Sequence, residues 1–409
     1  MRVSVVLSKN TCIFGNALNT YVFGICFRGI IKSIVNIGKF FLRKNSIKQV
    51  GLMLLTISVI LTGCVGGSSG SGLSLVGTGS MQSTALFAMD TVMELEIAGN
   101  EALLTQAEDI IRGIEKTLST TDEDSEIARL NKDGAMQLSG DTAELMKEAL
   151  EICQKTDGAL DITIYPVLRA WGFTTAAYTV PSEEELKELL KHVDYRLVQL
   201  ELDSNGDGTK SSVADEVGSK CEIPDGTLVD LGSVAKGYTG RKLADFFVEN
   251  GVQSGLINLG GNVQCIGSKT NGQPWKVAIK SPFKESSGGI FGVLQASDTS
   301  IITSGGYERY FEKNGKTYWH IIDPETGFPA DNGVVSVTIV TKDGTMGDGL
   351  STALFVMGLD DAVEYYKENE GFDVIIITKD KEAYISEGIY DKFSLTSEYY
   401  DTKLHMISR

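Results

Sequence analysis

The chain has 409 residues, of which 42% are hydrophobic and 22% charged, so it is long enough and apolar enough to form a large folded core. Its formal net charge is −17, although residues 1–63 carry only basic charges, so the remaining body is more acidic still. Such a body excludes a protein that binds the phosphate backbone of nucleic acids, but it leaves room for a local anion site.

Residues 1–63 are predicted to be a leader and lipoprotein signal peptide. The apolar run at residues 50–61 follows Lys44 and Lys48, and it is short enough to suit a signal-peptide core better than a membrane span. A small residue, Gly63, then precedes Cys64, which resembles a bacterial lipoprotein processing site. Cys64 is therefore the predicted lipidation site. An uncleaved anchor helix with an incidental cysteine is the alternative.

The segment after Cys64 is rich in glycine and serine, so residues 64–81 are predicted to be a lipidated, flexible tether. The folded domain is predicted to span residues 82–409. This organisation predicts an extracytoplasmic protein that lipid at Cys64 anchors to the cell membrane. The cysteines show no CxxC spacing, which indicates neither a zinc site nor a disulfide framework.

Helix and strand patterns alternate through the body. Residues 92–97 alternate apolar and acidic side chains, as a half-buried strand does, and residues 101–118 place apolar side chains at helical spacing, as at Ile111 and Ile114. Further elements are predicted from caps and apolar runs: a helix capped by Asp141 with Glu144 and ending near Lys155, a helix opened by Ser182 with Glu185, a helix at 235–250 closed by Gly251, and strands at 255–259, 334–340 and 374–378. This mixture predicts an α/β (α+β mixed) fold class.

Two local patterns have structural interpretations. Cys153 falls at an apolar helical position and is predicted to be a core residue. Residues 203–208 match the first half of a calcium loop, but Ala214 stands where the loop needs a bidentate glutamate, so a hydrophilic turn is predicted instead.

The first cluster with chemical potential runs from Thr156 to Phe173. Asp161 and Thr163 follow a glycine-containing turn and can hold a polar edge of a ligand, while Trp171 and Phe173 can stack on a flat ring. A plain turn is the alternative, since glycine and aspartate favour turns.

The second cluster is the sequence DLGSVAKGY at residues 230–238, where a strand ends in a glycine turn that opens a helix. Helix N-termini bind anions through free amides and the helix dipole. Lys236 stands at the unfavourable end of that dipole, and its placement makes sense if it meets a phosphate. A solvent-facing lysine is the alternative.

Three further clusters follow along the chain. NLGGN at residues 258–262 permits close backbone approach to a ligand, and His320 is the only histidine placed among turns and hydroxyls. Asp348 and Thr352 are four residues apart and present hard oxygen ligands on one helical face, as Mg²⁺ prefers. The alternatives are a structural bend, a strand-end histidine, and Asp348 as a helix cap beside a packed threonine.

In this order, the clusters resemble the ApbE-type FAD:protein FMN transferase family over about residues 88–358. The motifs that carry the resemblance are SEIARLN (125–131), DLGSVAKGY (230–238), NLGGN (258–262), TSG (303–305), HIIDPETG (320–327) and Asp348 with Thr352. The resemblance implies an α/β body with an FAD cleft between two lobes.

The resemblance also implies the residues of the site. FAD would be lined by Met89, Ala159, Leu160, Asp161, Asp230, Lys236, His320 and Ile321. The cofactor Mg²⁺ would be surrounded by Ser233, through its carbonyl, and by Asp348, Ser351 and Thr352. FAD itself would be the substrate.

By the same resemblance, the FAD pyrophosphate is split while the metal and Lys236 stabilise charge on the phosphates. A Ser or Thr hydroxyl of an acceptor flavoprotein, in a Ser/Thr-Gly-Ala-Thr type motif, attacks and releases AMP. His320 or Asp348 would be catalytic by assisting its deprotonation. A Mg²⁺-dependent FAD pyrophosphatase and a flavin-binding lipoprotein without turnover are the alternatives. The chain has no such acceptor run itself, which favours the modifying enzyme over a modified flavoprotein.

The sequence departs from the family at three places. Thr120 and Thr121 stand where the family often has an aromatic residue, so flavin stacking is in doubt there. Arg241 replaces a common aspartate and could alter the edge of the site. Ser233 replaces a commoner glycine or alanine, which matters little if its carbonyl is the ligand.

Overall fold

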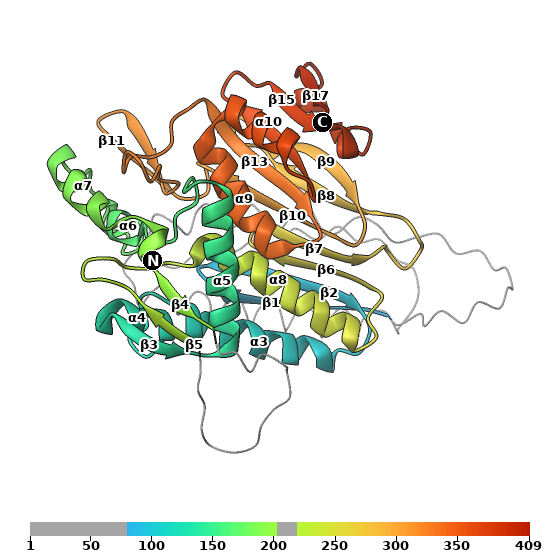
Figure 1. Cartoon of the computed structure of the whole chain (residues 1–409). Helices are drawn as coiled ribbons and strands as arrows, with labels where there is room; N and C mark the ends of the chain where they lie inside the picture. Colours follow the sequence, from blue (N-terminus) through green and yellow to red (C-terminus); the bar gives the residue numbers. More distant parts are fainter. Residues whose placement is uncertain (1–79, 203–218) are drawn as a thin grey trace, which may run out of the picture. The chain divides into compact units, whose positions relative to one another are not determined.

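The computed structural model describes residues 80–202 and 219–409 (Figure 1). All of these residues belong to one compact unit, residues 76–409. The predicted leader, Cys64, nearly all of the tether and the calcium-like turn therefore lie outside the described residues. Within the described ranges, no helix is both long and apolar enough to cross a membrane.

A nine-stranded sheet forms the centre of the domain, in the order β1-β2-β6-β7-β10-β13-β14-β15-β17. Neighbouring strands are antiparallel, except that β15 and β17 are parallel. The strands are β1 (Met81–Ala88), β2 (Thr91–Ala98), β6 (Ser254–Leu259), β7 (Asn262–Gly267), β10 (Thr299–Gly305), β13 (Val334–Thr341), β14 (Phe372–Thr378), β15 (Ala383–Ser386) and β17 (Leu404–Ile407).

Helices cover one face of this sheet (Figure 1). They are α3 (Ala102–Leu118), α5 (Gly140–Lys155), α8 (Gly232–Glu249), α9 (Gly344–Met357) and α10 (Leu359–Glu368). Leu104 of α3 and Phe247 of α8 pack against Leu95 of β2, while Phe355 of α9 packs with Val374 of β14. The hydrophobic effect of burying these side chains holds the layers together.

A smaller sheet, in the order β16-β9-β8, covers the other face. Its strands are β8 (Trp275–Lys280), β9 (Ile290–Ala296) and β16 (Phe393–Leu395). Successive side chains of β14 alternate between the two cores: Ile375 packs with β8 and β9, and Ile376 with the helices. Strands covered on both faces are mostly apolar, which is why β13 and β14 are rich in valine and isoleucine.

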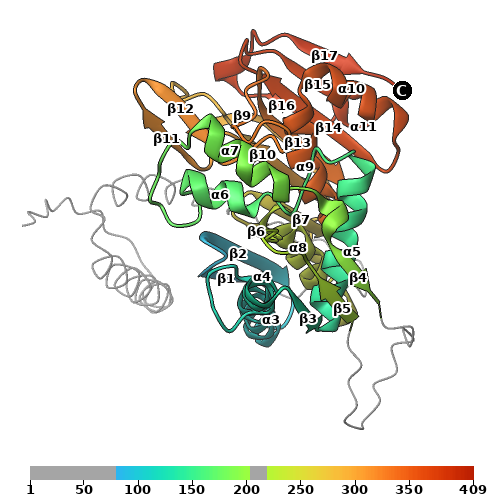
Figure 2. The ribbon, with the colours of Figure 1, turned by 60° about the vertical axis from the view of Figure 1, so that its left-hand side comes forward.

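The remaining elements are shorter. They are α4 (Glu126–Asp133), β3 (Ala135–Leu138), α6 (Tyr165–Trp171), α7 (Glu183–Leu189), η1 (Leu190–His192), η2 (Tyr195–Leu197), β4 (Gln199–Glu201), β5 (Ser219–Glu222), β11 (Tyr310–Lys313), β12 (Lys316–Trp319), α11 (Glu387–Tyr390) and η3 (Ser397–Tyr399). Helix α11 contacts β14, β15 and β17, and η3 contacts β9. Both views show α6 and α7 beside the β11–β12 hairpin (Figures 1 and 2), and an apolar cluster that includes Trp171, Leu186 and Tyr318 joins them.

Most sequence-based predictions of elements are confirmed. The strands at 92–97, 255–259, 334–340 and 374–378 are β2, β6, β13 and β14, and the helix at 101–118 is α3. Ser182 caps α7, since its Oγ accepts the amide of Glu185 at 3.1 Å. The side chain of Cys153 is fully buried, as predicted. The helix predicted from Ala235 begins earlier, at Gly232.

The predicted cap of α5 is wrong. Ser139 occupies the N-cap position, and Asp141 lies inside the first turn. The carboxylate of Asp141 instead contacts α8, at 2.8 Å from Lys242 and 3.1 Å from the hydroxyl of Tyr238. Asp141 therefore bonds to α8 instead of capping its own helix. Lys242 offers a charged donor and Tyr238 a neutral one, and together they bind the carboxylate.

Candidate functional site

Asp230 links two segments that carry predicted site residues. Its amide donates to the carbonyl of Ile162 at 2.9 Å, and its Oδ1 accepts the amide of Gly232, the first residue of α8, at 2.6 Å. Desolvation raises the pKa of Asp230, while the Gly232 amide, Arg309 and Lys236 oppose that shift. Protein atoms surround the Asp230 carboxylate closely enough to shift its pKa, while part of the residue's surface remains accessible to solvent.

Helices α8 and α9 meet at Gly237 and Asp348. The amide of Gly237 donates to Oδ2 of Asp348 at 2.8 Å, and the Asp348 side chain is only 4% exposed. Desolvation raises the pKa of Asp348, and Lys236 and Asn262 lower it. Asp348 is not the helix cap: Asp343 is the N-cap of α9 and accepts the Met346 amide at 3.1 Å.

Lys236 lies near three acidic groups without a direct partner. It is partly buried, and its charge lowers the pKa values of Asp230, Glu308 and Asp348. No ion pair of Lys236 within 4.0 Å occurs among the described residues. Lys236 stands one turn inside α8 rather than in its first turn, so its charge remains available for an anion.

The predicted metal-binding hydroxyls lie on α9 opposite β10. Ser351 Oγ donates to the carbonyl of Asp348 at 2.8 Å and lies 2.7 Å from Ser304 Oγ; Thr352 Oγ1 lies 3.2 Å from the same Ser304 hydroxyl. Over residues 80–202 and 219–409, no group of three or more His, Cys, Asp or Glu side chains is placed to hold a metal ion. A magnesium ion here would depend on water and phosphate oxygens for much of its coordination.

The turn between β6 and β7 approaches Asp348. Gly260 and Gly261 have φ angles of +70° and +109°, which a residue with a side chain rarely adopts. The amide nitrogen Nδ2 of Asn262 is buried and makes no hydrogen bond of normal geometry in the described part of the chain, while the Asn262 side chain interacts weakly with the Asp348 carboxylate and lowers its pKa. A buried donor without a partner costs free energy, so a ligand oxygen would fit there.

His320 follows β12 and is held by Arg309. Both its backbone amide and its ring Nδ1 lie near the Arg309 carbonyl, at 3.1 and 3.2 Å. Burial lowers the pKa of His320 to about 3, and the charges of Arg309 and Lys236 act in the same direction. The imidazole is therefore neutral at neutral pH, and a proton on Nδ1 leaves the lone pair of Nε2 available.

Met89 lies in the two-residue turn between β1 and β2. Met89 and Asp90 have φ angles of 46° and 59°, and the Met89 amide donates to Glu115 Oε1 at 2.6 Å. The Met89 sulfur lies 3.9 Å from Thr239 Oγ1 on α8, and Asp90 lies 3.7 Å from Arg309. A methionine with positive φ is strained, which is common where a turn must present a residue to a ligand.

Several predicted side chains are already occupied. Asp161 accepts from both the amide and hydroxyl of Thr163 at 2.8 and 2.6 Å, and from the Tyr195 amide at 2.9 Å. Leu160 packs against Gly349 of α9, and Ile321 is buried in the core. Ala159, beside Leu160, is partly exposed. The buried Leu160, Asp161 and Ile321 would contact a ligand through their backbone atoms.

The predicted stacking role of Trp171 is wrong. Its ring is fully buried, and its Nε1 donates to the Gly327 carbonyl at 2.8 Å. It packs against Tyr318 and Phe328 at ring distances of 5.2 and 5.7 Å. Trp171 thus holds the β11–β12 hairpin against α6, and that hairpin leads to His320.

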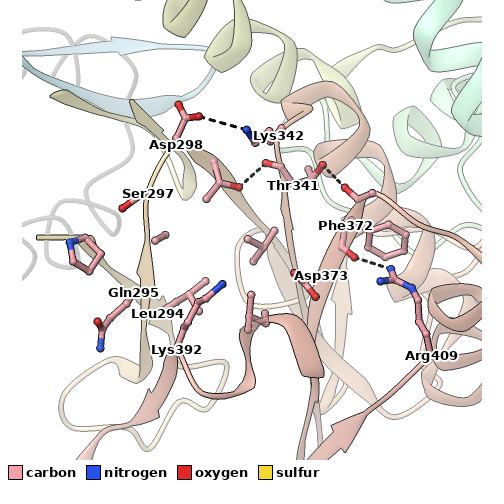
Figure 3. Close-up of a pocket in the computed structure, with 16 residues that line it drawn as sticks. Leu294, Gln295, Ser297, Asp298, Thr341, Lys342, Phe372, Asp373, Lys392 and Arg409 are labelled. Carbon is pink, nitrogen blue, oxygen red and sulfur yellow. Dashed lines mark hydrogen bonds and ion pairs between the residues drawn. The ribbon is translucent and has the colours of Figure 1, made fainter. Parts of the chain in front are cut away.

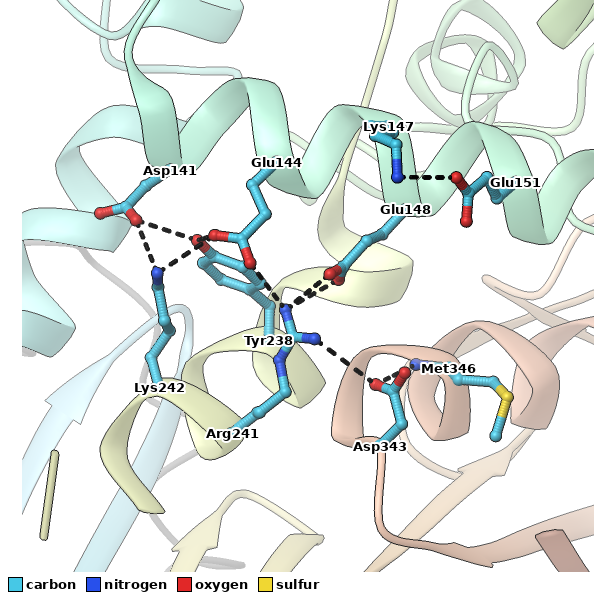
Figure 4. Close-up of polar contacts among 10 residues, drawn as sticks. All are labelled: Asp141, Glu144, Lys147, Glu148, Glu151, Tyr238, Arg241, Lys242, Asp343 and Met346. Atoms are coloured by element: carbon cyan, nitrogen blue, oxygen red, sulfur yellow. Dashed lines mark hydrogen bonds and ion pairs between the residues drawn. The ribbon is translucent and has the colours of Figure 1, made fainter. Parts of the chain in front are cut away.

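Arg241 turns away toward α5 (Figure 4). Its guanidinium lies 2.8 Å from Glu148 and 3.4 Å from Glu144, and 4.0 Å from Asp343 at the start of α9. The neighbouring Tyr238 places its hydroxyl between Asp141 and Glu144. Arg241 therefore belongs to a network of charges between helices, and this departure from the family does not place a charge beside Lys236.

A cavity of about 650 Å³ lies elsewhere, among the ends of β9, β13 and β14 and the C-terminal residue (Figure 3). None of the predicted site residues lines it. Its Arg409 is committed to carbonyls, including that of Phe372 at 2.9 Å, and its Lys342 pairs with Asp298 at 3.6 Å. Both of these basic side chains are thus held by contacts within the protein.

Sequence reasoning gave no role to some residues that the structure places at the site. Ser304, Asn262, Glu308 and Arg309 belong to or adjoin quoted motifs, but strand ends and turns gave no sign of which side chains face inward. Asn131 lies about a hundred residues away in sequence from the segment that it contacts. Only the SEIARLN motif itself indicated that this helix matters.

The sequence is similar to a known protein family. A family model described as the ApbE family matches residues 89–376. The chain is 32% identical over 289 residues to the FAD:protein FMN transferase of Haemophilus influenzae, across 69% of this chain and 80% of that relative. It is 33% identical over 288 residues to the FAD:protein FMN transferase of Vibrio cholerae, across 69% and 81%.

Solved structures show the same fold. The crystal structure of the ApbE protein from Thermotoga maritima superposes with a TM-score of 0.65 at 29% identity, covering 79% of this chain and 99% of that one. The flavin transferase ApbE from Vibrio cholerae gives a TM-score of 0.61 at 27% identity, with the same coverage.

Proposed function

Because the chain belongs to the ApbE family, we propose that it transfers the FMN moiety of FAD to a hydroxyl of an acceptor protein. The observation that carries this proposal is the meeting of three groups: Lys236, which has no ion pair among the described residues, the desolvated carboxylate of Asp348, and the buried amide Nδ2 of Asn262, for which the described residues provide no hydrogen-bond acceptor of normal geometry. These groups suit a ligand that brings phosphate oxygens.

The site fits FAD together with Mg²⁺. The two glycines of the β6–β7 turn allow close backbone approach, and the orphaned Nδ2 of Asn262 needs an acceptor such as a phosphate oxygen. Asp348, Ser351, Thr352 and the Ser233 carbonyl would hold the ion, with FAD phosphates completing its shell. Bound there, Mg²⁺ would supply charge stabilisation at the pyrophosphate.

The chain's own residues then account for the transfer. The acceptor hydroxyl oxygen forms a bond to the phosphorus of the FMN half, the bond from that phosphorus to the bridging oxygen breaks, and AMP leaves with the electron pair. Lys236 and Asn262 stabilise the developing negative charge. Met89, Ala159 and Asp230 line the FAD site, with backbone groups of Leu160, Asp161 and Ile321.

His320 is the better candidate for the group that takes the hydroxyl proton. Oδ2 of Asp348 already accepts the Gly237 amide, whereas Nε2 of a neutral His320 is free to accept. Positive neighbours contribute to the low pKa of His320, so the negative phosphates of FAD would raise that pKa toward the range of a useful base.

The proposal extends to the place of the reaction. The apolar run before Cys64 and the glycine- and serine-rich segment after it support a lipoprotein held at the outer side of the cell membrane. Its acceptor would then be an extracytoplasmic or membrane-linked flavoprotein with a Ser/Thr-Gly-Ala-Thr type motif.

A mass measurement tests the reaction. The protein is incubated with FAD, Mg²⁺ and an acceptor that carries such a motif, and intact masses are recorded. A gain of one FMN on the acceptor, lost with EDTA and in an acceptor whose hydroxyl residue is replaced by alanine, supports the transferase. AMP and free FMN formed without any labelled acceptor would instead indicate hydrolysis of FAD. FAD that binds and remains intact would leave a flavin-binding protein without turnover.

A further inference from the structure

The helix α4 is fixed at both ends. Ser125 is 1% exposed, and its Oγ accepts the Ala128 amide at 3.0 Å while its hydroxyl donates to the carbonyl of Ser119. At the other end, Gly134 has a φ of +75° and donates to the Leu130 carbonyl at 2.9 Å. Caps at both termini and a buried apolar face give this short helix a defined position.

Asn131, near the end of α4, holds the backbone of Val229. Its Nδ2 donates to the Val229 carbonyl at 2.8 Å, and its Oδ1 accepts the Val229 amide at 2.6 Å. The side chain thus satisfies both backbone groups of one residue, as a neighbouring strand would.

The segment that Asn131 holds is buried, with Val229 and Leu231 packed in the core, but it has little regular backbone pairing of its own. Residues 227–231 belong to no helix or strand, apart from a single bridge between Leu228 and Ile164. The next residue, Asp230, donates its amide to the carbonyl of Ile162, and its carboxylate accepts the amide of Gly232, the first residue of α8. The segment that ends in Asp230 is therefore held from two sides. Asn131 bonds to it on one side, and residues 162–164 bond to it on the other.

We infer that Asn131 is a positioning residue for FAD binding, which it serves by holding Val229 and so fixing Asp230 and the start of α8 with Lys236. The inference rests on the proposed function, since Asp230 and Lys236 are placed there at the FAD site. Within residues 80–202 and 219–409, the side chain of Asn131 hydrogen-bonds to Val229 alone, so it acts through the backbone. A displacement of a binding group by about 1 Å can cost about 100-fold in rate.

Two substitutions separate positioning from simple support of the fold. Asn131→Ala removes both bonds to Val229, while Asn131→Asp keeps an acceptor for the Val229 amide and loses the donor to its carbonyl. Asn250→Ala is the matched control, because Asn250 Nδ2 donates to the Phe246 carbonyl at 2.8 Å at the far end of α8. FAD affinity is measured with the full-length protein by quenching of flavin fluorescence, without acceptor, at a temperature where thermal unfolding shows every variant folded.

We expect the Kd for FAD to rise about 10-fold or more in Asn131→Ala, less in Asn131→Asp, and not in Asn250→Ala. In steady state, KM for FAD should rise more than kcat falls. When Asp230→Asn is already present, Asn131→Ala should raise the Kd for FAD less than it does alone, because Asn131 acts by positioning Asp230.

Lower thermal stability of both Asn131 variants with an unchanged Kd for FAD would overturn the inference and leave Asn131 a purely structural residue. If the losses of FAD affinity in Asn131→Ala and Asp230→Asn add fully in the double variant, Asn131 does not act through Asp230. A wild-type protein that binds FAD without transferring FMN would contradict the proposed function alone, since the comparison of Kd values would stand. A wild-type protein that binds no FAD would overturn both.

Discussion

Gly237 and Asp348 set the spacing of the two helices that carry the site: the amide of one donates to the carboxylate of the other at 2.8 Å. A Cβ built on Gly237 would lie 2.0 Å from the Gly344 carbonyl oxygen. Because Gly237 has no side chain, the backbones of α8 and α9 can touch there. This close approach sets the distance between Lys236 and Asp348.

Gly237→Ala should therefore be strongly destabilising. The neighbour that a methyl group would meet is backbone, which cannot rotate away, so we expect a loss of about 3 kcal/mol or more of unfolding free energy. Calorimetry measures it, with Gly113→Ala as the control: Gly113 lies in α3 with nothing within 4 Å of its added Cβ. The control should gain up to about 1 kcal/mol. Equal melting temperatures for the two variants would contradict this account of the helix contact.

Asp348→Asn should abolish most FMN transfer. The substitution keeps the shape of the side chain but removes the charge that faces Lys236, and we expect a rate loss of about 100-fold or more. Asp343→Asn is the control on the same helix, since asparagine also caps helices and Asp343 is 47% exposed. Labelling of the acceptor followed by mass spectrometry checks both. Wild-type rates in Asp348→Asn would exclude the carboxylate from the reaction.

Lys236→Met should weaken FAD binding. Removal of a charged donor to a phosphate costs about 1.5–3 kcal/mol, or about 10- to 100-fold in Kd. Lys242→Met is the comparison on the same helix, because Lys242 pairs with Asp141 at 2.8 Å and not with the site. Titration of FAD at low and high salt should also show a smaller salt dependence in Lys236→Met. Equal losses in the two variants would indicate a general effect of charge.

Arg241→Ala should affect stability and spare FAD affinity. Its pair with Glu148 is 23% and 22% exposed, which suggests about 1 kcal/mol. Glu148→Gln should give a similar loss, and the double variant should lose less than the sum because the two side chains share one interaction. Urea unfolding and FAD titration on the same samples measure both quantities. A changed Kd for FAD would mean that Arg241 reaches the site after all.

His320 should titrate far below the usual range of histidine. Since burial lowers its folded pKa to about 3, from an unfolded value of 6.5, the unfolded state binds more protons between these values. The contribution of His320 to stability is therefore complete above about pH 6.5 and falls as pH decreases toward 3. Comparing wild type with His320→Gln at pH 7.5 and pH 4.5 isolates it: the stability of the wild type should fall more. An NMR titration that finds a pKa near 6.5 would refute this.

The local patterns of the sequence predicted the helices and strands well, because spacing and caps report on short-range geometry. The apolar runs at 334–340 and 374–378 indicated strands, and Ser182 indicated the start of a helix. Asp141 misled because its carboxylate had a better partner on α8, nearly a hundred residues away. A local rule cannot weigh a contact that only the folded chain creates.

The site was predicted largely through the family resemblance, and its internal order was not. Nothing in the sequence showed that both carboxylate oxygens of Asp161 accept hydrogen bonds, from Thr163 and Tyr195, or that the Trp171 ring is buried in the core. The sequence also gave no sign that Asn262 keeps a buried donor free. Which atom of a residue faces a ligand depends on the strand or turn that carries it, and that is a property of the tertiary structure.

The candidate residues for FAD and Mg²⁺ run from Met89 to Thr352, and they come from a hairpin turn, two loops, two helices and a strand end. No contiguous fragment of the chain holds a complete set, so affinity for the dinucleotide belongs to the assembled domain. FAD would then act as a non-covalent cross-link across the sheet: it binds the folded chain alone, and at about 100 times its Kd it would add about 2.7 kcal/mol to the free energy of unfolding. The FAD-loaded form should therefore resist heat and proteases longer than the empty one.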